Sequence, residues 1–114
     1  MSVRGETLLW LAQRASAAVL AFLVLVHLGT MVYAVQGGLS AAEILARTRG
    51  SALWGAFYGL FVLMVAVHAP IGLRNVLAEW FGWRGTSLGI AMLALGVFLA
   101  AFGGRAVWAV VGAS

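Results

Sequence analysis

Residues 50–73, GSALWGAFYGLFVLMVAVHAPIGL, contain no charged side chain. An α-helix rises about 1.5 Å per residue, so this stretch is long enough to cross a bilayer core of about 30 Å. Residues 15–42 and residues 85–104 are free of charge in the same way. The three stretches predict transmembrane helices at about 15–36, 53–77 and 86–104.

The composition of the whole chain agrees with a membrane protein. Of its 114 residues, 64% are hydrophobic and 9% are charged, and the mean hydropathy is +1.07. Soluble domains carry about 25% charged residues, so this chain has too little polar surface to cover a globule in water. We therefore expect an all-α membrane protein, with residues 1–114 forming a single three-helix transmembrane domain.

The charged residues and the lack of cysteine exclude several kinds of site. The net charge is +4, but the arginines are scattered singly, whereas nucleic-acid-binding surfaces have clustered basic residues. We expect no nucleic-acid partner. Because the chain has no cysteine, it cannot form a disulfide or supply thiolates to a zinc ion or an iron–sulfur cluster.

Local signals predict the first connection and the orientation. Ser40, followed by Glu43 three residues later, has the pattern of a capping box, which predicts a short helix at about 41–48. Cytoplasmic ends of membrane helices carry an excess of positive charge, which favours a cytoplasmic N-terminus. In that orientation the inner end carries four arginines and the outer end three: Arg4, Arg14, Arg74 and Arg84 inside, and Arg47, Arg49 and Arg105 outside.

Both histidines, His27 and His68, fall inside predicted spans. An ionisable side chain at that depth is costly and usually faces a partner, a cavity or a cofactor. His68, Gly72 and Glu79 lie on one helical stripe, and Gly72 leaves a gap one turn from the imidazole. Since imidazole is a common axial ligand of haem iron, His68 is the first candidate metal ligand. His27 is a second candidate, and a hydrogen-bonded core histidine is the alternative for either residue.

The spacing of the two histidines predicts how they would bind iron. If residues 37 and 52 lie at equal depth, His27 is level with residue 62. His68 is then about 9 Å away along the helix axis. This separation disfavours one haem held by both histidines of one chain, and it favours pairing of His68 with a histidine of another chain.

Residues 68–80, HAPIGLRNVLAEW, resemble the second-helix signature of the cytochrome b membrane-anchor subunits of succinate dehydrogenase and fumarate reductase. That signature has a histidine, a glycine four residues later, an arginine, and then an acidic residue followed by an aromatic one. Gln13-Arg14-Ala15-Ser16 resembles the His-Arg-x-Ser/Thr-Gly opening of the same family. The resemblance covers essentially the whole chain.

The resemblance implies a non-catalytic subunit of an oxidoreductase complex in the bacterial inner membrane. Haem b would lie between this chain and a second three-helix anchor or another copy of the chain, within the lipid bilayer. A flavoprotein and an iron–sulfur subunit would dock on the cytoplasmic side, and electrons would pass between succinate or fumarate and a quinone. By position, the resemblance makes His68 the axial iron ligand, Gly72 a haem-packing residue, Arg74 a partner of the haem propionates, and Arg14, Ser16, Glu79 and Trp80 the quinone pocket.

Some residues depart from the family pattern. Trp80 stands where tyrosine is frequent, and Trp10 where well-known members have serine. Gln13 and Asn75 stand where histidines are common in one of the paired anchors. Two other functions stay open, namely a haem-free structural anchor and a small oligomeric transporter. A transporter would be marked by a carboxylate in mid-membrane, but all three glutamates lie outside or at the ends of the predicted spans.

Overall fold

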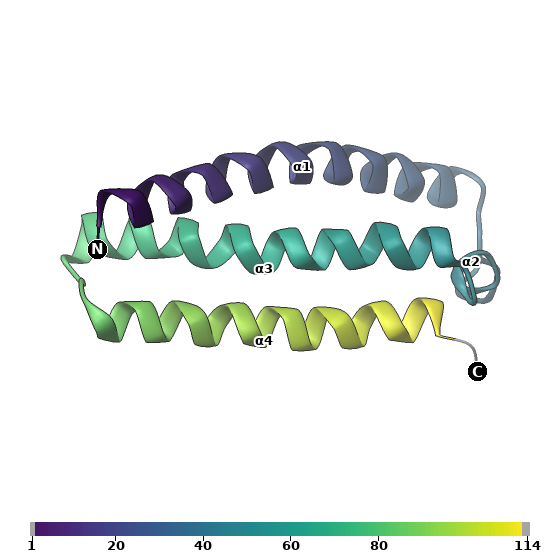
Figure 1. The fold of residues 1–114 in the computed structure, drawn as a ribbon. Coiled ribbons are helices and arrows are strands. Elements are labelled where there is room, and N and C mark those ends of the chain that lie inside the picture. Colours follow the sequence, from purple (N-terminus) through teal and green to yellow (C-terminus); the bar gives the residue numbers. More distant parts are fainter. Residues whose placement is uncertain (1, 113–114) are drawn as a thin grey trace.

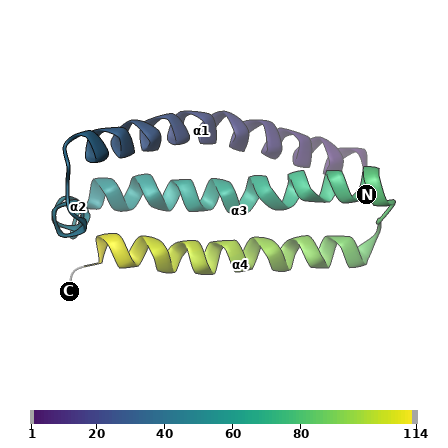
Figure 2. The same ribbon diagram turned by 180° about the vertical axis from the view of Figure 1, so that it is seen from behind.

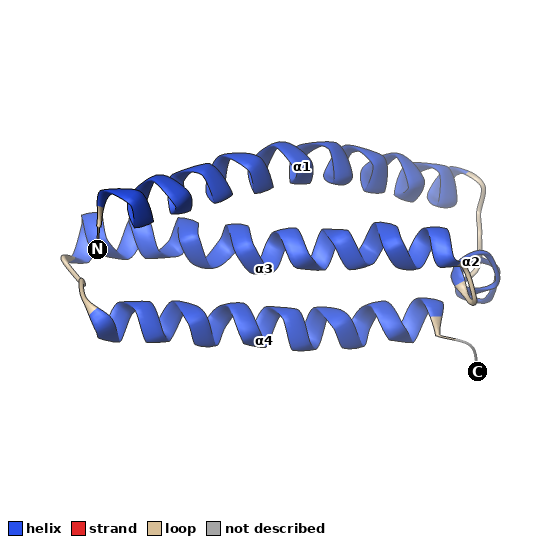
Figure 3. Ribbon diagram, viewed as in Figure 1, coloured by secondary structure: helices blue, strands red, loops and turns tan. Residues whose placement is uncertain are grey.

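The computed structural model describes residues 2–112 and consists of four α-helices (Figures 1 and 3). They are α1 (Val3–Gln36), α2 (Ala41–Thr48), α3 (Ala52–Phe81) and α4 (Thr86–Val111). The described residues contain no strand. The long helices α1, α3 and α4 are each long and apolar enough to cross a membrane. The prediction of an all-α integral membrane protein is therefore confirmed.

The three long helices lie side by side with α3 in the middle (Figures 1 and 2). Helices α1 and α4 each pack against α3 and hardly contact each other. The short helix α2 lies crosswise at the end of the bundle that carries the end of α1 and the start of α3. The start of α1 and the end of α4 lie at opposite ends of the bundle, as three spans require (Figure 1).

Helix α1 begins at Val3, well before the predicted start at residue 15. The side chain of Ser2 caps the helix by accepting a hydrogen bond from the backbone N–H of Gly5 at 3.0 Å. A run without charge marks the part of a helix that suits the bilayer, whereas the helix itself continues as long as its backbone hydrogen bonds do. The prediction of the start of α1 was therefore wrong.

The other long helices also extend beyond the predicted ends. Helix α3 covers residues 52–81 instead of 53–77, and it ends where Gly82 adopts a left-handed conformation with φ of 68°. Helix α4 reaches Val111 instead of residue 104. In both cases charged or interfacial residues continue the helix past the apolar run.

The short helix α2 covers residues 41–48 and has the predicted capping box, in which the Ser40 and Glu43 side chains each bond the other's backbone N–H. The buried hydroxyl of Thr48 donates to the carbonyl of Val110 at 2.7 Å. The backbone N–H of Gly50 donates to the carbonyl of Val111 at 2.8 Å. These bonds hold α2 against the end of α4.

Glycines let α4 approach α3 closely. A Cβ atom at Gly103 would lie 2.5 Å from the Val62 side chain, and one at Gly96 would lie 3.3 Å from the carbonyl oxygen of Ala66. That carbonyl is the one that Pro70 leaves without its usual helical donor, because proline has no backbone N–H. The close approach of Gly96 therefore covers a polar atom that the sequence frees inside the membrane.

The chain has little interior of its own. Among the described residues, the buried apolar side chains are Leu23, Pro70 and Leu88, and the buried polar ones are Ser16 and Thr48. Large apolar side chains along all three spans are exposed. Lipid or another membrane subunit must cover these surfaces.

Candidate functional site

The imidazole of His68 faces α1 and contacts Ser16. Its Nδ1 atom lies 3.4 Å from Ser16 Oγ, and only 2% of the Ser16 surface is exposed. The Ser16 hydroxyl also donates to the Gln13 carbonyl at 3.1 Å. Because a hydroxyl has a single proton, this arrangement favours donation from His68 Nδ1–H to Ser16 Oγ. The Nε2 atom then keeps its lone pair, which is the form of histidine that binds a metal.

The space beside Gly72 is filled by the side chain of Gln13. A Cβ atom at Gly72 would lie 3.1 Å from Gln13 Nε2. The gap that the sequence predicts for a flat ligand is thus occupied by an amide in this structure. Gln13 Oε1 is buried and has no hydrogen-bond partner among the described residues. An unsatisfied buried acceptor costs about 1–3 kcal/mol, so this oxygen marks a place where a bound molecule or a partner subunit would supply a donor.

Sequence reasoning did not single out Gln13 as a site residue. The residue lies outside the charge-free run that defined the first predicted span, so its depth was underestimated. A signal was present in the sequence, because Gln13 lies about one turn before Ser16 and therefore on the same side of a continuous helix.

The four residues predicted to line a quinone pocket lie in separate places within this chain. Ser16 is buried beside His68, whereas the Arg14 guanidinium lies over the Trp10 ring at 5.6 Å from its centroid. Glu79 and Trp80 are exposed near the end of α3. All four lie toward the N-terminal end of the bundle, but the chain alone does not bring them together.

Glu79 lines a polar cavity of about 330 Å³ at this end of the bundle. The cavity is formed by α1, α3 and the start of α4, and it has two carboxylates and two guanidinium groups in its wall. Its charged lining residues are Glu6, Arg74, Glu79 and Arg84.

Arg74 lies on the side of α3 that faces α4. Besides the polar cavity, it lines an apolar cavity of about 510 Å³ together with Pro70 and Gly96. His68 instead contacts Ser16 on α1. The chain therefore does not bring Arg74 and His68 to one face of α3.

His27 lies far from His68. Its Nδ1 atom is 3.3 Å from the hydroxyl of Tyr58, and its ring packs edge-on against Tyr58 and Phe61. The His27 ring thus lies beside residues 58 and 61, within about one turn of the expected residue 62. Ten residues of α3, or about 15 Å along its axis, separate Tyr58 from His68. The two histidines cannot bind one iron in this chain, and the described residues contain no cluster of three metal-ligating side chains.

Comparison with known proteins identifies the family. A family model described as the succinate dehydrogenase/fumarate reductase transmembrane subunit matches residues 1–104. No curated protein and no solved structure matches the chain significantly. The match includes α1, α2, α3 and most of α4, with every candidate site residue named above. The chain therefore belongs to the family of transmembrane subunits of succinate dehydrogenase and fumarate reductase.

Proposed function

We propose that this transmembrane subunit binds haem b through His68 and transfers electrons between the soluble subunits of the complex and a quinone. The observation that carries the proposal is the contact between His68 Nδ1 and Ser16 Oγ at 3.4 Å. It orients the imidazole and leaves Nε2 as the metal-binding atom. When bound, haem supplies a carrier of single electrons.

The residues around His68 suit such a group. Ser16 contacts Nδ1, the ring nitrogen that would not bind the iron, as hydrogen-bond partners commonly do for metal-binding histidines. Gly72 adds no side chain one turn away, and the unpaired Gln13 amide can move because it ends a flexible side chain. Since His27 contacts Tyr58, which lies about 15 Å from His68 along α3, a second ligand of the iron would come from a second anchor or another copy of this chain.

Arg74 is a candidate partner for the haem propionates. It lies six residues after His68, or about 9 Å along α3, toward the end of the bundle that carries Arg14 and Arg84. A guanidinium group suits carboxylates because its N–H donors form a fork that matches them. The long side chain would have to reach around α3 from the α4 side.

The quinone is proposed to bind near the same end of the bundle. Reduction of a quinone consumes two electrons and two protons, so its oxygens need hydrogen-bond donors and a proton source. Arg14 and Ser16 are donors on α1, and Trp80 carries an indole donor on α3. Glu79 lines a polar cavity that also contains Glu6, which suits transfer of protons from water. A neighbouring anchor would complete this pocket, because the groups lie apart within one chain.

The proposed orientation places the N-terminus in the cytoplasm of a bacterium, with the chain in the inner membrane. Arg4, Arg14, Arg74 and Arg84 then lie on the inner side, in accord with the positive-inside rule. The flavoprotein and iron–sulfur subunits would dock on that side, next to the proposed quinone pocket.

The proposal is tested by reduced-minus-oxidised absorption spectra of the complex purified through this subunit. We expect a b-type haem signal in the wild type, its loss in His68→Ala, and its retention in His27→Ala as the matched control. Absence of haem from the wild type would overturn the proposal in favour of a haem-free anchor. Equal loss in both variants would show that His68 is not the specific ligand.

A further inference from the structure

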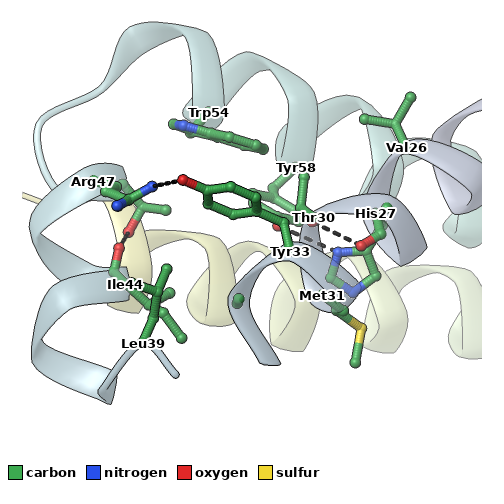
Figure 4. Close-up of a pocket in the computed structure, with 13 residues that line it drawn as sticks. Val26, His27, Thr30, Met31, Tyr33, Leu39, Ile44, Arg47, Trp54 and Tyr58 are labelled. Carbon is green, nitrogen blue, oxygen red and sulfur yellow. Dashed lines mark hydrogen bonds between the residues drawn. The ribbon is translucent and has the colours of Figure 1, made fainter. Parts of the chain in front are cut away.

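A groove lies at the end of the bundle opposite the N-terminus. Its upper part is a cavity of about 470 Å³ walled by α1, α2 and α3, with the rings of Tyr33, Trp54 and Tyr58 and the side chain of Arg47 around it (Figure 4). Its lower part is a cavity of about 370 Å³ that reaches α4 at Gly103. The two parts share four lining residues, His27, Ile44, Thr48 and Tyr58.

The groove follows from the packing of the long helices. Because α1 and α4 pack on α3 but hardly on each other, a channel remains between them, with α2 across its outer end. Both cavities fall within the range of about 300–1,000 Å³ that is usual for ligand sites. Side chains along the channel are exposed toward the bilayer, including Tyr33 at 61% and Met31 at 51%.

Three hydroxyl groups of the wall are paired within the chain. The hydroxyl of Thr30 donates to the His27 carbonyl at 2.7 Å, and that of Thr48 donates to the Val110 carbonyl at 2.7 Å. His27 Nδ1 lies 3.3 Å from the Tyr58 hydroxyl. The wall therefore offers a mainly apolar surface at membrane depth, which suits an aliphatic chain.

Arg47 supplies the only charge in the lining of either cavity. Its Nη1 atom donates to the Tyr33 hydroxyl at 3.4 Å, and the guanidinium carbon lies 5.5 Å from the centre of that ring. This is the one side-chain hydrogen bond of Arg47 among the described residues, whereas a guanidinium has five N–H donors. The remaining donors can bind an anion at the rim.

The backbone that carries Arg47 is held in place by the attachment of α2. Thr48, the next residue, is bonded to Val110, and Gly50 N–H donates to the Val111 carbonyl at 2.8 Å. These contacts hold α2 across the end of the bundle and keep the cation above the apolar channel. A fixed cation at the membrane surface with an apolar groove beneath it matches an amphiphile with an anionic head and an aliphatic tail.

We infer that this groove is a binding site for an anionic phospholipid. Its phosphate contacts Arg47 and the Tyr33 hydroxyl, and one acyl chain lies along the channel between α1 and α4. The charge favours an anionic head over a zwitterionic one, because no carboxylate lines either cavity to hold an ammonium group. The inference does not depend on haem or quinone binding.

The test is native mass spectrometry of the whole complex in mild detergent, after addition of vesicles of phosphatidylglycerol or phosphatidylethanolamine. We expect tighter retention of phosphatidylglycerol. Arg47→Gln should weaken that retention about fivefold, the effect of one basic residue near a membrane surface. Arg49→Gln is the matched control, because Arg49 ends the same helix and lines neither cavity.

A second variant tests the channel. A Cβ atom at Gly29 would meet nothing within 4 Å, and Gly29 lines the upper cavity. Gly29→Leu therefore starts in open space and places a larger side chain at the channel. It should reduce retention of the lipid. Gly104→Leu is its control, since Gly104 has equally open surroundings and lines neither cavity. The inference would be overturned if neither Arg47→Gln nor Gly29→Leu changed lipid retention, or if both lipids were retained equally. Binding of a quinone in place of lipid would also overturn it.

Discussion

His68 and Ser16 are 52 residues apart in the sequence, and their side chains lie 3.4 Å apart across the interface between α1 and α3. Ser16 is among the few buried polar residues of the described chain. Because its hydroxyl proton goes to the Gln13 carbonyl, its oxygen can accept from His68 Nδ1–H. By the family pattern, Ser16 belongs to the quinone pocket and His68 is the haem ligand, and here the two side chains are in contact. In this chain Ser16 is placed to orient the imidazole directly.

Loss of the Ser16 hydroxyl should therefore weaken haem binding. We expect Ser16→Ala to lower haem affinity about tenfold. This is the lower end of the range for loss of a residue that hydrogen-bonds to a metal-binding histidine. Ser16→Thr, which keeps the hydroxyl, should retain more haem. Haem per complex and the haem midpoint potential are the measurements. Identical values in the wild type and Ser16→Ala would mean that the contact does not orient the ligand.

The contact between Gly72 and Gln13 can be tested by a pair of substitutions. A Cβ at Gly72 would lie 3.1 Å from Gln13 Nε2, the end of a flexible side chain. Gly72→Ala should therefore be tolerated, whereas Gly72→Val should reduce haem content and thermal stability. Adding Gln13→Ala should restore part of the loss, because it removes the amide group with which the valine side chain would clash. If Gln13→Ala restored neither haem content nor thermal stability, the effect of Gly72→Val would arise from contacts other than that with Gln13.

The sequence was sufficient for features that depend on local chemistry. Absence of charge located the three spans, and Ser40 with Glu43 located α2 because a capping box involves neighbours only. The pairing of helices depends on distant contacts, so His27 was placed one turn from its actual partner, Tyr58. The side of α3 on which Arg74 lies could not be assigned either, because it depends on where α4 packs.

Glu79 should matter for proton supply and not for haem binding. Groups that transfer protons contribute about 10²–10⁴-fold to rate, but Glu6 shares the cavity and can replace Glu79 in part. We expect Glu79→Gln to slow succinate-driven quinone reduction about tenfold, and Glu6→Gln with Glu79→Gln to slow it further. Haem spectra should stay unchanged. Glu43→Gln at the opposite end is the control, and full activity of the double variant would exclude this route.

The contact between Gly103 and Val62 should determine how closely α4 can pack on α3. A Cβ at Gly103 would lie 2.5 Å from the Val62 side chain, whereas one at the adjacent Gly104 would meet nothing within 4 Å. Gly103→Ala should thus destabilise the subunit by about 1–3 kcal/mol, the usual cost of overpacking, while Gly104→Ala should leave stability almost unchanged. The thermal midpoint of the detergent-purified complex, followed by tryptophan fluorescence, measures both. Since Val62→Ala removes the clashing methyl groups, it should restore stability to Gly103→Ala. Equal thermal midpoints for Gly103→Ala and Gly104→Ala would contradict the close packing of α4 on α3.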